Sequence, residues 1–264
     1  MAATASPNPF GMRAEGGSRA GIDREECAPA LRLLVDPTAG VQLQGLPSGR
    51  WRICRGNDLD GMLAAVEDLS DDGGVYFSLN PCPPDLGRPI RVGDMLRRHR
   101  FLIDLDTVRA RGTNATDAEK HAAEDVALRV RLHLEGLDWP PPLHADSGNG
   151  THLLYAIDLP NDDESRELLK AVLAALGGQF DQAAVQIDRK VINANRVSKL
   201  PGTWARKGPH TPERPWRMAR IVSAPDALEV VTADQLRVVL EVPTTYVEPQ
   251  HTAPTHPLDM TATR

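Results

Sequence analysis

Two aspartates, Asp104 and Asp106, are the residues of this 264-residue chain best suited by type and spacing to chemistry. They end the segment Phe101–Asp106, whose apolar alternation predicts a β-strand. Because successive strand side chains point to opposite faces, both carboxylates would share one face while Leu105 faces the core. Oxygen ligands of this kind suit Mg²⁺ or Mn²⁺. Without a cation the two carboxylates repel, so removing one should cost little stability or even raise it.

The same Asp-Leu-Asp pattern occurs at Asp58-Leu59-Asp60, where we expect a helix to begin. On a helix, side chains two residues apart diverge, and an aspartate at the start caps backbone N–H groups. An isolated Asp-x-Asp therefore indicates a turn or cap more often than a metal site. The strand context makes the two interpretations of Asp104 and Asp106 about equal.

A second motif is the segment 147–152, Ser-Gly-Asn-Gly-Thr-His. Gly148 and Gly150 leave little side chain in the way, so the backbone can approach a ligand closely. The strand that follows would present His152 at its start. The alternative is an ordinary Asn-Gly hairpin turn followed by an edge histidine.

A third motif is the short predicted strand Val185–Asp188, which ends in a carboxylate and precedes a basic run. The run contains Arg196, Lys199 and Lys207, whose charges suit phosphate groups. Asp188 would then be a further metal ligand. The alternative is a solvated basic loop, which leaves the order of the three motifs unexplained.

The elements that must position these motifs follow from periodicity and turn signals. Thr116 and Glu119 match a capping box that opens a long helix ending near Gly136. Gly177-Gly178 is expected to end the helix that begins at Asp162 or Asp163. The remaining predicted strands are 41–46, 51–55, 75–79, 152–157 and 219–222, and the remaining helices are 58–69 and 232–240. This alternation predicts an α+β fold with helices on one face of a sheet.

Composition limits the classes of protein that remain. With 41% hydrophobic and 25% charged residues the chain is typical of a globular protein, and no apolar run reaches the roughly 20 residues of a membrane span. Three distant cysteines indicate reduced thiols and a cytoplasmic location. Residues 1–26 and 247–264 are predicted to be a disordered arm and a disordered tail or linker around a 27–246 core. A net charge of −6 means that nucleic acid would need local basic patches. Arg97, Arg98 and Arg100 are candidates for a nucleic-acid-binding strip, and a solvated surface is the equally good alternative.

The order of these motifs resembles the archaeo-eukaryotic primase superfamily, in particular the primase-polymerase domains of phage, plasmid and mobile-element replication proteins. Phe101–Asp106 is similar to its first motif, Ser147–His152 to its second, and Ile187-Asp188 to its third. The stretch 195–200 is similar to a basic element that often follows the third motif in the family. One departure is Gly150, since the family often has a serine two positions before the histidine, a role that Ser147 could take.

The resemblance implies an N-terminal α/β unit, 27–100, packed on an RRM-like catalytic unit, 101–246. It implies template-dependent nucleotidyl transfer that makes primers or extends DNA strands. Its catalytic and metal residues would be Asp104, Asp106 and Asp188, holding two Mg²⁺ or Mn²⁺ ions. The residues that would bind the incoming nucleotide are Ser147, Asn149, His152, Arg196, Lys199 and Lys207.

Single-stranded DNA and nucleoside triphosphates are the partners this function requires. No phosphate loop of the Gly-x₄-Gly-Lys-Ser/Thr type occurs, so a replicative helicase would be a separate partner. The basic residues beyond Asp188 exceed what one triphosphate needs, which predicts a second nucleotide site and primer-independent initiation. They are Arg189, Lys190, Arg196, Lys199, Arg206 and Lys207.

Other classes fit the sequence less well. A Toprim enzyme needs a glutamate where the strand 75–79 ends in Asn80, and a rolling-circle initiator needs a His-x-His pair that the sequence lacks. A non-catalytic RRM-like nucleic-acid binder remains the alternative. Such binders stack bases on aromatic side chains, and only 4% of these residues are aromatic.

Overall fold

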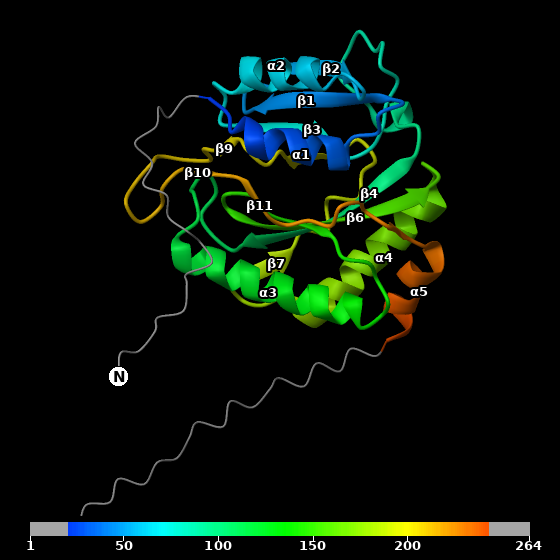
Figure 1. Cartoon of the computed structure of the whole chain (residues 1–264). Coiled ribbons are helices and arrows are strands. Elements are labelled where there is room, and N and C mark those ends of the chain that lie inside the picture. The colour runs from blue at the N-terminus through cyan, green and yellow to red at the C-terminus, as the bar shows by residue number, and fades with distance from the viewer. Residues whose placement is uncertain (1–20, 243–264) are drawn as a thin grey trace, which may run out of the picture.

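The computed structural model describes residues 21–242 (Figure 1). Most of the expected arm and all of the expected tail lie outside this range. Helix α1 (Arg24–Leu34) begins after Asp23, whose side chain accepts a hydrogen bond from the Glu25 amide at 3.1 Å. Residues 24–26 are therefore helical, where the sequence analysis placed the end of an arm.

Four antiparallel strands form the first sheet, in the order β2-β1-β3-β8. Their bounds are β1 Gly40–Leu46, β2 Trp51–Arg55, β3 Gly74–Ser78 and β8 Val197–Lys199. Alternate residues of β1, Val41 and Leu43, are buried with the apolar side of helix α2 (Leu59–Leu69). The other face of this sheet is left for the site.

The second sheet has the order β11-β5-β6-β4-β7, with β12 added in parallel to β6. Its strands are β4 Arg98–Thr107, β5 Leu143–Asp146, β6 Gly150–Leu159, β7 Val185–Ile187, β11 Arg220–Ser223 and β12 Val230–Val231. Helix α3 packs on β4 and β6, and α4 packs on β7, on the side away from the first sheet (Figure 1). The fold is thus mixed α/β, with five helices in the described range and sheets that are antiparallel apart from β12.

Helix boundaries show which local signals were sufficient. The predicted capping box opens α3 (Asp117–Glu135), with Glu119 N donating to Thr116 Oγ1 at 3.1 Å. The predicted end of α4 (Asp163–Phe180) at Gly177-Gly178 is wrong. The helix continues because Phe180 is buried at its far end, while the Arg189 guanidinium occupies the space a side chain at Gly177 would need.

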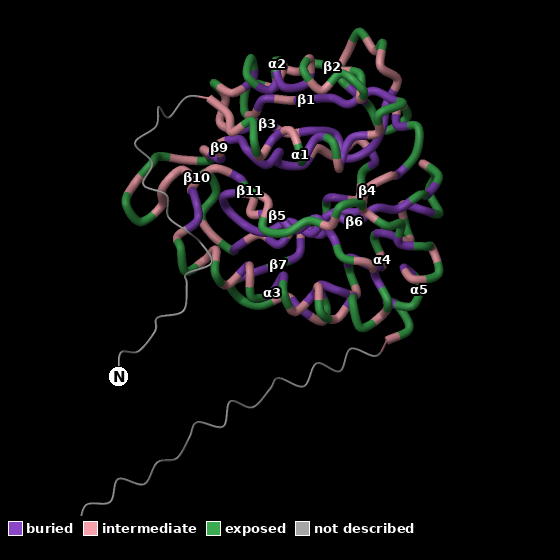
Figure 2. The backbone as a smooth tube through the Cα atoms, viewed as in Figure 1, coloured by how far each residue is buried: buried purple, intermediate pink, exposed green. Residues whose placement is uncertain are grey.

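Strand β8 affects the predicted division of the chain. It comes from the second half of the sequence, yet it pairs with β3, so that Tyr76 lies opposite Lys199. A boundary at residue 100 therefore does not separate the two sheets. The buried residues form one large cluster that includes strands of both, and Figure 2 shows them concentrated in the strands and inner helix faces.

Short elements complete the chain. They are the 3₁₀ turn η1 Val92–Asp94, the hairpin strands β9 Trp204–Ala205 and β10 Arg217–Met218, and helix α5 Ala233–Glu241. Helix α5 packs on α4. Between residues 21 and 242 no helix has the length and apolar character needed to cross a bilayer.

Candidate functional site

A pocket of about 270 Å³ lies between the two sheets. Both sheets and the connecting segments supply its walls. Its lining residues are Leu46, Tyr76, Leu102, Asp104, Asp106, Ser147, Asn149, His152, Arg196, Val197, Ser198, Lys199, Ala205 and Lys207. Two of the three predicted carboxylates and all six predicted nucleotide-binding residues therefore meet in one place.

The carboxylates of β4 have the geometry expected of an Asp-x-Asp pair in a strand. Leu105 is fully buried, whereas Asp104 and Asp106 both line the pocket. Asp104 lies directly opposite His152 of β6, and its Oδ1 is 3.4 Å from His152 Nε2. Because the predicted strand forms and pairs in this register, the same-face arrangement is confirmed.

Positive groups decide the charge state of Asp104. Burial raises the pKa of its carboxyl, but His152, Lys207 and Arg196 outweigh that effect and leave the pKa below its ordinary value. The carboxylate is therefore stabilised where it lies. This differs from the sequence expectation, which considered only repulsion from Asp106.

Asp106 contacts two cations. Its Oδ1 accepts a hydrogen bond from Arg109 at 2.7 Å, and its Oδ2 lies 3.8 Å from Lys207 Nζ. The Arg109 side chain is only 6% exposed, so it is part of the structure of the site. Arg109 was not predicted from the sequence, although its position three residues after Asp106 is a usable signal.

The glycine-flanked loop is shaped by close packing. A Cβ at Gly150 would lie 2.4 Å from the Leu105 carbonyl oxygen, so no serine fits there without movement of β4. Gly148 has φ +86°, which glycine adopts readily. The Ser147 hydroxyl is hydrogen bonded within the loop, to the amide and carbonyl of Gly150 at 3.0 and 3.1 Å.

Asn149 presents a donor with no protein partner. Its Oδ1 accepts a hydrogen bond from the Ala115 amide at 2.7 Å, which orients the side chain. Its Nδ2 is buried and has no hydrogen-bond partner, although the residue is only 2% exposed. A buried donor left unsatisfied costs roughly 1–3 kcal/mol, so this amide is suited to an acceptor on a bound ligand.

Asp188 is placed differently from its prediction. Its amide donates to the Asp104 carbonyl at 2.8 Å, but its carboxylate accepts from the Lys190 amide at 2.8 Å and from Arg196 at 3.2 Å. It is absent from the pocket lining. Across residues 21–242 no group of three or more histidine, cysteine or acidic side chains is arranged to hold a metal ion. In this arrangement Arg196 and the Lys190 amide hold the Asp188 carboxylate outside the pocket that Asp104 and Asp106 line, and its role as a metal ligand stays a prediction.

Lys199 is a buried amine. It is 4% exposed, donates to the Trp204 carbonyl, and lies 5.2 Å from the Tyr76 ring centroid. Burial lowers the pKa of its ammonium group well below the ordinary value, and Arg206 and Lys207 lower it further. A phosphate in the pocket would favour its charged form.

The hairpin of β9 and β10 positions Lys207 through contacts with Asn114, which were not predicted from the sequence. The Lys207 amide donates to Asn114 Oδ1 at 3.0 Å. Asn114 is 1% exposed, and its Nδ2 contacts carbonyl oxygens of the hairpin, including that of Pro209 at 3.0 Å. Arg214 ties the hairpin to Glu119 at 2.7 Å. No periodicity signal marks a single buried asparagine in a loop.

The surplus of cations expected for a second nucleotide is smaller in the structure. Arg189 pairs with Asp181 at 2.7 Å, and the Arg206 guanidinium lies 5.7 and 5.5 Å from the rings of Trp204 and Trp216. Of the six basic residues, the pocket is lined by Arg196, Lys199 and Lys207.

The prediction that Arg97, Arg98 and Arg100 form a nucleic-acid-binding strip is wrong. Arg98 is 3% exposed and donates to the Ile192 carbonyl at 2.7 Å. Arg100 is also engaged with main-chain carbonyls, including that of Leu33 at 3.2 Å. Only Arg97 is largely exposed, and it pairs with Asp158 at 2.5 Å. These arginines satisfy the backbone where chain segments meet.

Asp104 and Asp106 supply oxygen donors of the kind that a divalent ion binds. Mg²⁺ is commonly held by one or two carboxylates together with substrate phosphates, with no dedicated protein cage. Two carboxylates on one face, beside cations that suit phosphate, fit that pattern. A cage of three protein ligands does not fit the described residues.

No protein-family model matches the sequence, and no curated protein matches it. Among solved structures, the chain is similar to the catalytic domain of primase RepB' in complex with initiator DNA, with a TM-score of 0.44 and 13% identity over 82% of this chain and 94% of that one. For primase RepB' the TM-score is 0.42, with 14% identity over 81% and 62% of the two chains. For the polymerase domain of Mycobacterium tuberculosis Ligase D in complex with DNA it is 0.42, with 15% identity over 81% and 86%.

These structural neighbours are primase and polymerase domains, the class that the sequence motifs resemble.

Proposed function

We propose that the chain is a nucleotidyltransferase of the primase-polymerase kind, which adds nucleotides to a DNA strand on a single-stranded template. One observation carries the proposal: Asp104 and Asp106 share a face opposite His152, in a pocket that also receives Arg196, Lys199 and Lys207. Carboxylates directly beside cations are the pairing that a metal-bound triphosphate needs.

The roles follow from position. In this proposal His152, Arg196 and Lys199 contact the phosphates of the incoming nucleotide. Asn149 offers its free Nδ2 to an acceptor on the nucleotide, while Ser147 holds the loop that carries Asn149. Catalysis would consist of positioning and charge neutralisation.

Asp104 and Asp106 would hold Mg²⁺ or Mn²⁺ with the substrate phosphates, with Asp188 as a further candidate ligand. When bound, the ion polarises the attacking hydroxyl and neutralises developing charge. Asp188 now holds Arg196, so in this arrangement it acts through that side chain. The proposal includes both primer synthesis and strand extension.

A non-catalytic nucleic-acid binder is the second candidate. It is favoured by the finding that, in the described range, no group of three or more histidine, cysteine or acidic side chains is arranged to hold a metal ion. A binder of this kind should neither need Mg²⁺ or Mn²⁺ nor consume nucleotides.

The test is incubation of the full chain with single-stranded template, labelled nucleotides and Mg²⁺ or Mn²⁺, with and without a primer. We expect metal-dependent products that are absent with Asp104→Asn. Primer-independent products would show initiation, and products that require a primer would show extension alone. Nucleic-acid binding without incorporation under either metal would establish the second candidate.

A further inference from the structure

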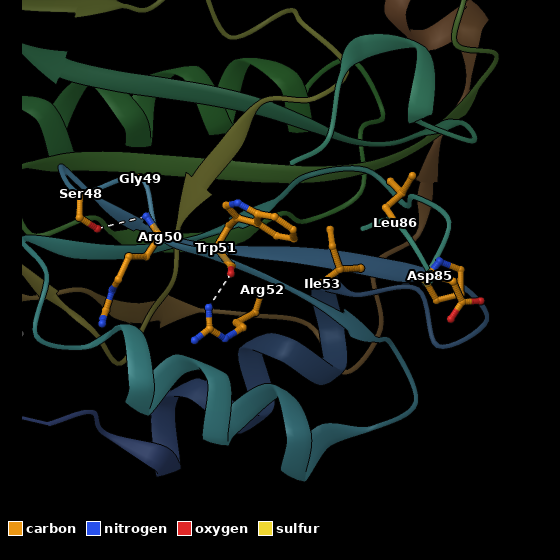
Figure 3. A pocket seen from close by; sticks show the side chains of 9 residues that line it. Ser48, Gly49, Arg50, Trp51, Arg52, Ile53, Asp85 and Leu86 are labelled. Atoms are coloured by element: carbon orange, nitrogen blue, oxygen red, sulfur yellow. Dashed lines mark hydrogen bonds between the residues drawn. The ribbon is translucent and has the colours of Figure 1, made fainter. Parts of the chain in front are cut away.

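A surface hollow of about 810 Å³ lies beside β2, at the edge of the first sheet opposite β8. It is separate from the pocket between the sheets. Figure 3 shows the residues that line it, which are Ser48, Gly49, Arg50, Trp51, Arg52, Ile53, Pro84, Asp85 and Leu86. The lining combines one indole, aliphatic side chains and two guanidinium groups.

One row of side chains connects the hollow to the pocket. Trp51 lies opposite Gln44, Gln44 opposite Tyr76, and Tyr76 opposite Lys199. Directly opposed residues of neighbouring strands point to the same face of a sheet. Since Tyr76 and Lys199 line the pocket, Trp51 lies on the same face of the sheet as the pocket. Trp51 and Lys199 are separated by three strand spacings, or about 14 Å.

The two sides of β2 differ in chemistry. Figure 3 shows the Trp51 and Ile53 side chains on one side of the strand and those of Arg50 and Arg52 on the other, towards α2. Arg52 pairs with Asp68 at 2.7 Å, side by side with Arg50 at the sheet edge. Ile53 also packs with Leu86 against a small buried cluster around Cys82 and Met95, which supports the wall of the hollow.

We propose that Trp51 is a stacking site for an unpaired base of single-stranded nucleic acid. A half-buried indole offers a flat surface that accepts any base. The Arg50 and Arg52 guanidinium groups lie at the same sheet edge but on its α2 side, where both contact Asp68. The indole therefore carries the site, and the arginines add positive charge near a nucleic-acid strand that passes the edge. The inference rests on the proposed function, which supplies the nucleic-acid strand.

The row of residues from Trp51 to Lys199 defines a path for the bound nucleic-acid strand. Bases beyond the one stacked on Trp51 would pass over Gln44, whose amide can hydrogen bond to base edges, and reach the pocket at Tyr76. The hollow therefore serves the template side of the reaction, a role that the buried Arg98 and the half-buried Arg100, both bonded to main-chain carbonyls, do not fill.

The test measures binding of a labelled oligothymidylate to the full chain by fluorescence anisotropy, in EDTA and without nucleotides. We expect Trp51→Ala to weaken binding at least about fivefold and Trp51→Phe to retain most of the affinity. Leu128→Ala, an exposed change on α3, is the control and should bind like the unmodified chain. The affinity for blunt duplex DNA, whose bases are already stacked, should be the same for Trp51→Ala and the unmodified chain.

Equal oligothymidylate affinity for Trp51→Ala and the unmodified chain would overturn the inference and leave the β2 edge to a peptide partner. An equal loss for duplex DNA would also overturn it, since that would reflect general electrostatics. Melting temperatures establish that the variants fold. Trp51→Leu, which keeps an apolar side chain but removes the aromatic face, should show the same loss of oligothymidylate affinity and replaces Trp51→Ala if that variant is unfolded. Trp51-dependent binding by a chain that never incorporates nucleotides would support the stacking site while the proposed function fails.

Discussion

The chain contains the sequence Asp-Leu-Asp twice, and the two copies have different surroundings. Asp58 caps α2, accepting a hydrogen bond from the Gly61 amide at 2.9 Å, and Asp60 lies in the first helical turn. Asp104 and Asp106 lie in β4, where alternation directs both into the pocket. Identical residue types at identical spacing thus serve a backbone in one place and form a two-carboxylate face in the other.

The partners of the two copies explain the difference further. The helix cap needs only a backbone N–H, which any helix start provides. The strand pair is surrounded by His152, Arg109 and Lys207 from three different segments. Such surroundings arise only through tertiary structure, so the site depends on the fold and the cap does not.

The largest expected effect separates the two copies by activity. Asp104→Asn and Asp106→Asn should each lower nucleotide incorporation at least about 100-fold, because the phosphoryl transition state loses charge neutralisation. The matched variants Asp58→Asn and Asp60→Asn should incorporate normally. Gel analysis of labelled products measures all four, and near-normal synthesis by Asp104→Asn would remove that residue from the site.

The next largest effect concerns the cations that lie near Asp104 and Asp106 in the pocket. Arg196→Ala should weaken nucleotide binding roughly ten- to a hundredfold, because a charge-assisted hydrogen bond contributes about 1.5–3 kcal/mol. Asp188→Ala, which removes the partner that orients Arg196, should have a smaller effect on the same titration. If Asp188→Ala abolishes incorporation with unchanged nucleotide affinity, Asp188 is a metal ligand as the sequence predicted.

A smaller effect should appear in stability for the helix copy. Asp58→Ala removes the cap of α2 and should lower the free energy of unfolding by about 0.5–2 kcal/mol. Asp58→Asn should lose little, since asparagine caps as well. Urea titration measures both, and an unchanged midpoint for Asp58→Ala would show that water replaces the cap.

The smallest effect is the pH dependence of the strand copy. Because the pKa of Asp104 is lowered in the folded chain, its carboxylate stabilises the fold above the ordinary pKa near 3.9 and loses this contribution as pH falls through the folded value. Asp104→Asn should therefore be slightly less stable at neutral pH, with the difference shrinking below about pH 4. A variant that is more stable than the unmodified chain at pH 7 would restore the repulsion argument.

Local sequence patterns were enough to predict most of the longer helices and strands. The alternation of β4, the capping box at Thr116 and the glycine-flanked start of β6 each carry their signal within a few residues. Helix α1 was missed because its first residues follow a segment rich in Ala, Gly, Ser and Pro, which predicted an arm as far as residue 26. Strand β8 has three residues, too few for a period to be recognised.

The site was predictable as a set of residues, but its contacts were not. Asp104, His152 and Lys199 meet as expected, yet nothing local indicates that Asp188 turns to Arg196 or that Asn149 keeps a buried donor. Exposure was equally hidden. The arginines at 97–100 look like a binding strip in sequence, and burial of Arg98 is decided by a carbonyl 94 residues away.

The pairing of β8 with β3 has a consequence for how such a chain can evolve. Recombination that joins residues 1–100 of one parent to the remainder of another would place a foreign strand against β3 and a foreign Lys199 opposite Tyr76. The wall of the pocket that the first sheet forms would then combine strands from two parents. Viable crossovers should instead fall after β8, near the glycine at position 202, so that the whole of the first sheet is inherited from a single parent.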